Sequence, residues 1–194
     1  MTESRWRFTM RLPSFALVAC LLPLAASAEV VDSGPSGFTL ENSAVVDADP
    51  DQAWKALVGD VGRWWPADHT WWGDAGKLSI EARAGGCFCE RDGDRQARHL
   101  EVVFVDPGRT LRLAGGLGPL QGMGLHGALE FRLAPVEGGG TRITLWYRVG
   151  GYSPDDLSGF AAVVDRVQAQ QLDGLVQFLA AHETGSAAAS GQGN

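Results

Sequence analysis

The sequence is poor in cysteine and has no concentration of positive charge. Only three of its 194 residues are cysteines, and Cys20 lies in an N-terminal apolar segment, which leaves Cys87 and Cys89 for the rest of the chain. Two cysteines are too few for the disulfide framework that stabilises many small secreted proteins. Because 23 acidic residues outnumber 16 basic ones and no run of Lys or Arg occurs, we expect neither nucleic acid nor anionic lipid as a partner.

Several catalytic and cofactor motifs are also missing. The sequence contains no Gly-x-x-x-x-Gly-Lys-Ser/Thr, which argues against a phosphate-binding loop, and no HExxH or CxxC ligand pattern. No Ser-His-Asp set or paired-carboxylate motif can be recognised either. We therefore predict no metal, no cofactor and no catalytic residue, and an enzyme is the less favoured class.

The first 28 residues have the layout of a secretory signal peptide. Three arginines precede an apolar run over residues 12–25, and Ala26-Ser27-Ala28 is a small-x-small cleavage site. The apolar run is too short, and too interrupted by proline, to span a membrane. Cleavage after Ala28 predicts a periplasmic or secreted protein of 166 residues.

A lipoprotein anchored through Cys20 is the alternative for this N-terminal segment. It is disfavoured because apolar residues continue past Cys20, where a lipoprotein normally turns polar. Removal of residues 1–28 takes away three Arg and one Glu, which leaves 13 basic and 22 acidic residues and a formal charge of −9.

The remaining chain is predicted to form one domain, with a linker before it and a flexible tail after it. Residues 29–37 are rich in Gly, Ser and Pro and predict a linker, and residues 184–194 predict a flexible tail. The ordered domain is expected over residues 38–183, a length that can bury a real core.

Within this domain the pattern predicts a strand, one or two short helices, six strands and a long helix. The first strand covers residues 38–48, and Asp49 followed by Pro50 and Gln52 predicts a capped helix start. Strands are expected over residues 77–84, 87–91, 97–105, 110–114, 125–133 and 142–149, separated by Gly-rich turns. Ser153-Pro154 then begins an amphipathic helix that ends near Glu183.

This order predicts an α+β fold, in which a seven-stranded curved antiparallel sheet surrounds a long C-terminal helix, with short helices after the first strand. The apolar stripe of the helix can be buried only against the concave face of the sheet. We expect a cavity between the two.

Four segments of the sequence resemble the SRPBCC superfamily, also called START-like. They are VDADPDQAWKALVGDVGRWWP (residues 46–66), RAGGCFCE (83–90), VVFVDPGRTLRL (102–113) and GALEFRLAPVEGGGTRITLWYRV (127–149). The chain is most similar to bacterial members of the polyketide cyclase/dehydrase-like and chaperone-ATPase-activator-like groups. The resemblance implies the helix-grip fold, but it leaves the function open, since carriers, cyclases and co-chaperones share that fold.

The most unusual feature is that four of the seven tryptophans lie within residues 64–72. They fill the core, line a ligand pocket or form an exposed surface for a partner, and the resemblance places them at the cavity mouth. Indole rings in a pocket wall suit a flat apolar ligand.

The Cys87-Phe88-Cys89 segment is predicted to lie on a strand with both thiols on one side. A disulfide is not expected there, because the Cα atoms of residues two apart in a regular strand are roughly 6.5–7 Å from each other. Two small buried hydrophobic residues, a redox-active pair and a metal site are the interpretations left open.

The Gly-rich stretch over residues 115–124 predicts an apolar hairpin tip, either a lid over the cavity or a floppy turn. The ionisable residues on the strands, His99, Glu90 and Glu130 among them, are interpreted as solvated outer-face charges. Strict alternation places His99 on the same face as Glu101.

Three functions follow from these observations. The favoured one is an exported protein that binds a small apolar or aromatic molecule; the alternatives are a cyclase/dehydratase-like enzyme and a protein-interaction module that uses the Trp-rich segment. The residues predicted to line the cavity are Trp64, Trp65, Trp71, Trp72, Phe88, Leu120, Met123, His126, Tyr147, Phe160 and Val164. A buried His99 or Glu90 with a shifted pKa and a polar partner would favour the enzyme.

Overall fold

The computed structural model describes residues 27–190. The predicted signal peptide lies outside the described residues except for Ser27 and Ala28, and so do the last four residues of the predicted tail. No helix within the described part of the chain is long and apolar enough to cross a membrane.

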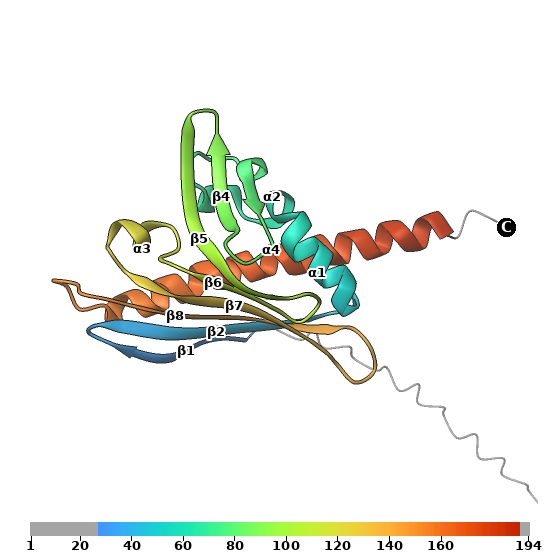
Figure 1. The fold of residues 1–194 in the computed structure, drawn as a ribbon. Helices are drawn as coiled ribbons and strands as arrows, with labels where there is room; N and C mark the ends of the chain where they lie inside the picture. Colours follow the sequence, from blue (N-terminus) through green and yellow to red (C-terminus); the bar gives the residue numbers. More distant parts are fainter. Residues whose placement is uncertain (1–26, 191–194) are drawn as a thin grey trace, which may run out of the picture.

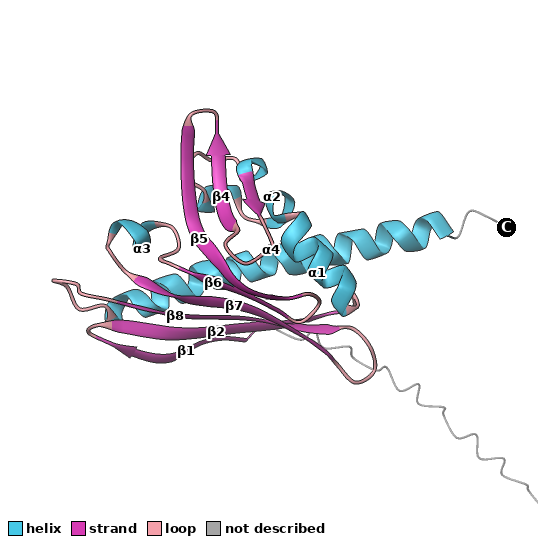
Figure 2. Cartoon of the chain, in the orientation of Figure 1, coloured by secondary structure: helices cyan, strands magenta, loops and turns pink. Residues whose placement is uncertain are grey.

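An eight-stranded antiparallel sheet forms the body of the protein (Figure 1, Figure 2). Its spatial order is β1-β2-β8-β7-β6-β5-β4-β3. The strands are β1 (Ser27–Gly34), β2 (Gly37–Val46), β3 (Leu78–Ile80), β4 (Cys87–Asp92), β5 (Arg95–Asp106), β6 (Thr110–Ala114), β7 (His126–Pro135) and β8 (Thr141–Gly150).

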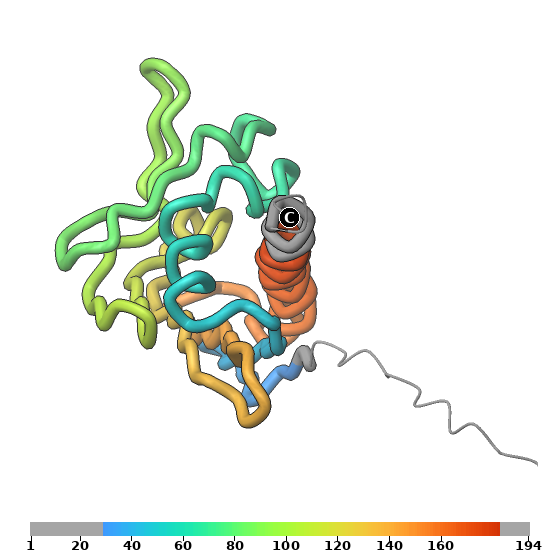
Figure 3. The backbone as a smooth tube through the Cα atoms, turned by 90° about the vertical axis from the view of Figure 1, so that its right-hand side faces the viewer, coloured from blue at the N-terminus to red at the C-terminus, as the bar shows by residue number. Residues whose placement is uncertain are grey.

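The helices are α1 (Pro50–Gly59), α2 (Val61–Trp64), α3 (Pro119–Gly122) and α4 (Ser158–Ser190), with two 3₁₀ turns, η1 (Ala67–His69) and η2 (Ala75–Lys77). The long helix α4 packs against β1, β2, α1 and α2. Figure 3 views the molecule along α4, which is seen end-on beside the rest of the fold. The predicted α+β helix-grip class is confirmed.

The sheet has one strand more than predicted, because residues 27–34 form β1 where a linker was expected from residue 29. This strand is held at the edge of the sheet by antiparallel backbone pairing with β2. Its Val30 and Val31 are exposed. Main-chain hydrogen bonds to β2 place this edge strand in the sheet, and such pairing needs no alternating apolar pattern in the sequence.

The two predicted helix starts had different outcomes. The Asp49 carboxylate accepts a hydrogen bond from the Gln52 backbone N–H at 2.8 Å, and the Gln52 side chain accepts one from the Asp49 N–H at 3.0 Å. The predicted cap of α1 is therefore confirmed. The predicted start of the long helix at Ser153 is wrong: α4 begins at Ser158, whose N–H donates to the Asp156 carboxylate.

The end of α4 also differs from the prediction. The helix continues to Ser190, past the expected end near Glu183 and into the region predicted as a tail. Its buried stripe is apolar at Ala161, Leu172, Leu175 and Leu179 but includes two glutamines.

A close contact between α4 and α2 holds the Trp-rich segment next to the long helix. The Cβ atom of any larger residue at Gly174 would lie 2.3 Å from the backbone oxygen of Trp64. Only glycine allows the two backbones to approach this closely.

Candidate functional site

A cavity of about 360 Å³ lies between the N-terminal half of α4 and the part of the fold formed by β4, β5, α3 and the Trp-rich segment. Apolar and aromatic side chains make up most of its wall. The lining residues are Trp65, Asp68, His69, Thr70, Trp71, Phe88, His99, Leu117, Gly118, Pro119, Leu120, Met123, Phe160, Val163, Val164, Val167, Gln168 and Gln171. Both the size and the apolar lining are typical of small-molecule sites.

The structure brings seven of the eleven predicted site residues together around this cavity. They are Trp65, Trp71, Phe88, Leu120, Met123, Phe160 and Val164. The other four, Trp64, Trp72, His126 and Tyr147, are not among the lining residues. His126 is exposed at the start of β7.

The first tryptophan pair is buried and largely structural. The Trp64 indole N–H donates to the Ala56 carbonyl at 3.0 Å, and its ring packs edge-on against Phe131. Trp65 packs edge-on against Phe88, with ring centroids 5.0 Å apart, and donates to the His69 carbonyl. Trp65 therefore forms part of the cavity wall, while Trp64 fixes α2 to α1 and to the sheet.

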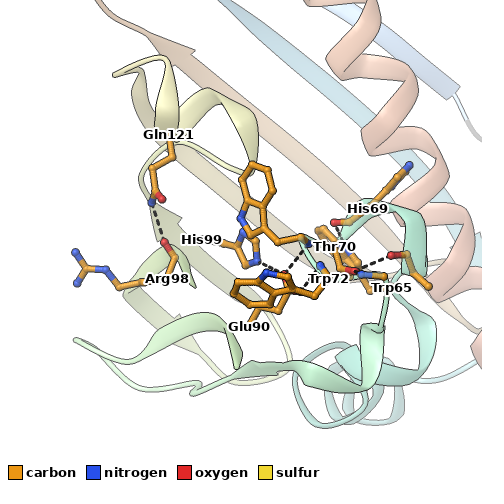
Figure 4. Close-up of polar contacts among 11 residues, drawn as sticks. Trp65, His69, Thr70, Trp72, Glu90, Arg98, His99 and Gln121 are labelled. Carbon is orange, nitrogen blue, oxygen red and sulfur yellow. Dashed lines mark hydrogen bonds and ion pairs between the residues drawn. The ribbon is translucent and has the colours of Figure 1, made fainter. Parts of the chain in front are cut away.

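The second tryptophan pair lies on a turn that Glu90 holds in place. The backbone N–H of Trp71 donates to Glu90 Oε2 at 3.0 Å, and that of Trp72 donates to Oε1 at 3.1 Å (Figure 4). The Trp72 ring turns toward Arg95, whose guanidinium lies 5.3 Å from the ring centroid. Trp71 remains 49% exposed and, with the exposed Phe160 and Val163, forms the rim of the cavity.

A β-bulge places His99 on the cavity side of the sheet. Phe88 of β4 pairs with Leu100 of β5, but the next residue, Cys89, pairs with Arg98, so His99 has no partner in the ladder. An extra residue of this kind redirects a side chain. His99 is consequently buried beside Leu100, whereas Arg98 is exposed.

The bulge overturns two sequence-based expectations. His99 does not share a face with Glu101, which instead forms an ion pair with Arg98. His99 and Glu90 are not solvated outer-face charges either, because they are 5% and 0% exposed. Glu130 is also buried, between Arg112 and Arg132, and those two guanidinium groups hold its pKa below the usual value against the opposing effect of burial.

The contact between His99 and Glu90 determines which nitrogen of the imidazole is free. Nε2 lies 3.1 Å from Glu90 Oε2, the oxygen that also accepts from the Trp71 N–H. A carboxylate that accepts here requires His99 to carry its proton on Nε2. Nδ1 is then an acceptor, and no residue in the described range 27–190 bonds to it.

Burial lowers the pKa of His99 from 6.5, and this effect exceeds the opposing influence of the hydrogen bond and the charge of Glu90. The imidazole is therefore neutral near pH 7. The Trp71 ring stacks against it with an interplanar angle of 13°, and the Phe88 ring lies 5.3 Å away. The cavity wall thus contains a neutral imidazole with a free acceptor nitrogen beside aromatic rings.

Hydrogen bonds to neighbouring strands hold the Gly-rich stretch over residues 115–124 in place. Its Leu117 N–H donates to the Tyr147 hydroxyl at 3.0 Å, and that hydroxyl donates to the Gly115 carbonyl at 3.2 Å. Gln121, on α3, donates to the Arg98 carbonyl (Figure 4). Burial raises the pKa of Tyr147 to about 12. Tyr147 was predicted to line the cavity, but it lies behind the wall and positions it.

The expectation that Cys87 and Cys89 form no disulfide is wrong, because their sulfur atoms are bonded to each other. The Cα–Cα distance is 5.4 Å, shorter than in a regular strand and within the normal range for a disulfide. The register shift at Phe88 and Cys89 accompanies this contraction of β4. The two residues are therefore joined by a covalent bond beside the bulge, and they are neither two free buried thiols nor a thiolate metal site.

The prediction missed eleven of the lining residues, two of them the glutamines Gln168 and Gln171 on α4. Both are buried and line the cavity. Their only sequence signal is that they interrupt the apolar stripe of the long helix. Residues 27–190 contain no group of three or more His, Cys, Asp or Glu side chains that could hold a metal ion.

Comparisons with known proteins agree with this geometry. Residues 37–180 match the family described as polyketide cyclase/dehydrase and lipid transport. Solved structures with a similar fold include CalU16 from Micromonospora echinospora, which is 19% identical, with a TM-score of 0.55 over 79% of this chain and 83% of that protein. No curated protein matches the chain.

Two further structures support the same fold. Protein MLL2253 from Mesorhizobium loti is 20% identical, with a TM-score of 0.52 over 73% of this chain and 96% of that one. An uncharacterised protein from Rhizobium leguminosarum is 20% identical, with a TM-score of 0.53 over 80% and 97%. At such identities the likeness shows the fold alone.

Proposed function

We propose that this chain, which belongs to the polyketide cyclase/dehydrase and lipid transport family, binds a small apolar or aromatic molecule between α4 and the sheet. The observation that carries this proposal is the cavity of about 360 Å³ with its mainly apolar wall. A packed interior has few voids larger than a water molecule, and an empty space of this size lowers the stability of the fold. A bound ligand would fill it.

The rim supports the same function. Trp71, Phe160 and Val163 expose apolar surface at the opening of the cavity. Large exposed apolar side chains that continue into a cavity are typical of a ligand entrance. Trp65 and Phe88, packed edge-to-face inside, offer aromatic surface against which a flat molecule can stack.

We also propose that the protein acts outside the cytoplasm, on the basis of the predicted signal peptide over residues 1–28. Sequencing of the N-terminus of the protein purified from its own host tests this. A mature chain that begins at Glu29 is the expected result, and an intact N-terminus would contradict export.

Native mass spectrometry of the protein purified from its host tests the binding function. A retained small molecule is expected, and its release should change the tryptophan fluorescence. Replacing Trp71 with Leu should weaken its affinity by about two- to tenfold, the loss of one aromatic contact. Trp146→Leu is the matched control, because Trp146 lies between Arg132 and Arg148 away from the cavity.

A second candidate function, a cyclase/dehydratase-like enzyme, is favoured by His99. A neutral imidazole with a free Nδ1 in an apolar cavity can remove a proton from a bound ligand, and Glu90 stabilises the resulting imidazolium. Incubation with host extract should then give a new product with the wild type and none with His99→Gln, although that variant still retains ligand. If both proteins give the same product profile, His99 has no catalytic role.

The third function, a protein-interaction module that uses the Trp-rich segment, has less support. Of its four tryptophans only Trp71 is exposed, while Trp64 and Trp65 are buried and Trp72 is half-buried. A single exposed ring is smaller than the apolar patch that marks an interaction surface.

A further inference from the structure

Gln168 and Gln171 are the two buried polar side chains that face the cavity from α4. They are 0% and 3% exposed and line it from one helix face, three residues apart. Neither Nε2 nor Oε1 of Gln168 has a hydrogen-bond partner among the described residues, and the same holds for Gln171 Oε1.

Such amides are unfavourable in a protein core. A buried amide without a partner loses its hydrogen bonds to water and gains none in return. The rest of the α4 stripe avoids this cost by using Leu and Ala. No side chain of the described residues supplies the missing partners, so a polar group of a bound molecule would do so.

The donors and acceptors in the cavity limit which polar group fits. Gln168 offers both a donor and an acceptor, and Gln171 Oε1 and His99 Nδ1 are acceptors. The buried Nδ1 of His69, in the same wall, also has no partner among the described residues. None of the lining residues in the described part of the chain is Lys or Arg; the titratable side chains among them are the carboxylate of Asp68 and the imidazoles of His69 and His99. A carboxylate would meet acceptor atoms and the like charge of Asp68, without the permanent cation of a Lys or Arg to pair with.

We infer that the cavity selects a neutral ligand that carries hydroxyl groups on an apolar body, a phenol rather than a fatty acid, with Gln168 and Gln171 binding its hydroxyl end. A hydroxyl donates to one glutamine oxygen and accepts from the Gln168 N–H, so each hydroxyl satisfies two of the three glutamine atoms that have no protein partner. The inference rests on the proposed binding function and adds the chemical class of the ligand.

Four probes that share one apolar body test this inference. The affinities of 2-naphthol, naphthalene, 2-naphthoate and 2-(aminomethyl)naphthalene are measured for the full-length protein by ligand-observed NMR at pH 7.5. We expect 2-naphthol to bind about tenfold more tightly than naphthalene, the gain of roughly one buried hydrogen bond, and 2-naphthoate to bind most weakly. Tightest binding by the carboxylate or by the amine would overturn the inference.

Variants then assign the preference to the two glutamines. Gln168→Met and Gln171→Met, alone and together, keep the side-chain volume but remove the hydrogen-bonding atoms. The double variant should bind 2-naphthol and naphthalene about equally, with naphthalene affinity unchanged or improved. Gln170→Met, an exposed position on the same helix, is the control and should retain the preference.

The outcomes separate this inference from the proposed function. If naphthalene and 2-naphthol bind equally to the wild type, the cavity binds apolar molecules but the glutamines do not select a hydroxyl. If the double variant still prefers 2-naphthol, the hydroxyl is recognised elsewhere and the inference fails. If no probe binds and no molecule is retained from the host, the binding function itself is wrong.

Discussion

His99 and Glu90 meet inside the protein, with Nε2 of the imidazole 3.1 Å from Oε2 of the carboxylate. The pair joins β5 to β4, and through the backbone of Trp71 and Trp72 it also joins both strands to the Trp-rich segment. One buried carboxylate therefore organises the aromatic wall of the cavity.

Glu90→Gln should destabilise the protein, because a carboxamide keeps the size of the side chain but replaces one acceptor oxygen with a donor. An N–H of Trp71 or Trp72, or the His99 Nε2–H, would then face another N–H. We expect a loss of about 1–3 kcal/mol in the free energy of unfolding, measured in urea. Glu101→Gln, which removes only an exposed ion pair with Arg98, should change it by less than about 0.5 kcal/mol.

The stability of the fold should depend on pH through His99. Burial lowers its pKa below 6.5 in the folded protein, so the unfolded chain binds this proton first as the pH falls. The contribution is fully present above pH 6.5 and is lost as the pH drops from there toward the folded pKa. His99→Phe should show a smaller loss of unfolding free energy between pH 7.5 and 5, whereas His126→Gln, at an exposed position, should follow the wild type.

Tyr147→Phe should loosen the stretch over residues 115–124, because the hydroxyl of Tyr147 bonds both the Leu117 N–H and the Gly115 carbonyl. Removal of the hydroxyl leaves the buried Leu117 N–H without a partner, at a cost of about 1–3 kcal/mol, while the Gly115 carbonyl keeps its bond from the Gly127 N–H. Hydrogen exchange should rise over these residues and not in β2. Unchanged exchange would show that the hydroxyl does not hold the wall.

The wild-type hydroxyl also predicts an alkaline effect. Because the pKa of Tyr147 is raised from 10.0 to about 12 in the folded protein, the unfolded chain loses this proton first. Its contribution to stability is present below pH 10 and is lost as the pH rises toward 12. Tyr147→Phe should be less sensitive over this interval than the wild type.

Gly174→Ala should be markedly destabilising, since its Cβ would lie 2.3 Å from the Trp64 backbone oxygen. The two helices would have to separate, which costs about 1–3 kcal/mol for overpacking. Gly159→Ala is the matched control on the same helix, because a Cβ added there would have no atom within 4 Å. Thermal unfolding should show a lower midpoint for the first variant and an unchanged or higher one for the second.

Much of the fold could be predicted because its determinants are local. The capping pair of Asp49 and Gln52 involves residues three apart, and the strand over residues 110–114 has the predicted bounds. Edge strand β1 was missed because backbone pairing with β2 forms it, and the start of α4 was misplaced because Asp156 rather than Ser153 caps it.

The site was less predictable because it depends on contacts between distant residues. Alternation placed His99 on the wrong face, and only the pairing of β4 with β5 reveals the bulge that turns it inward. At the same point of the ladder Cys87 and Cys89 lie within disulfide range, contrary to the geometry of a regular strand.

By itself, the sequence determined the helix-grip architecture, since alternation, turns and caps act over a few residues and add up to one arrangement. It also placed aromatic residues at the cavity, although it did not separate Trp65 and Trp71 in the wall from Trp64 and Trp72 outside it. Tertiary structure alone decided the polar chemistry of the cavity. The contact of His99 with Glu90 depends on the bulge in β5, and the burial of Gln168 and Gln171 depends on how α4 packs against the rest of the fold.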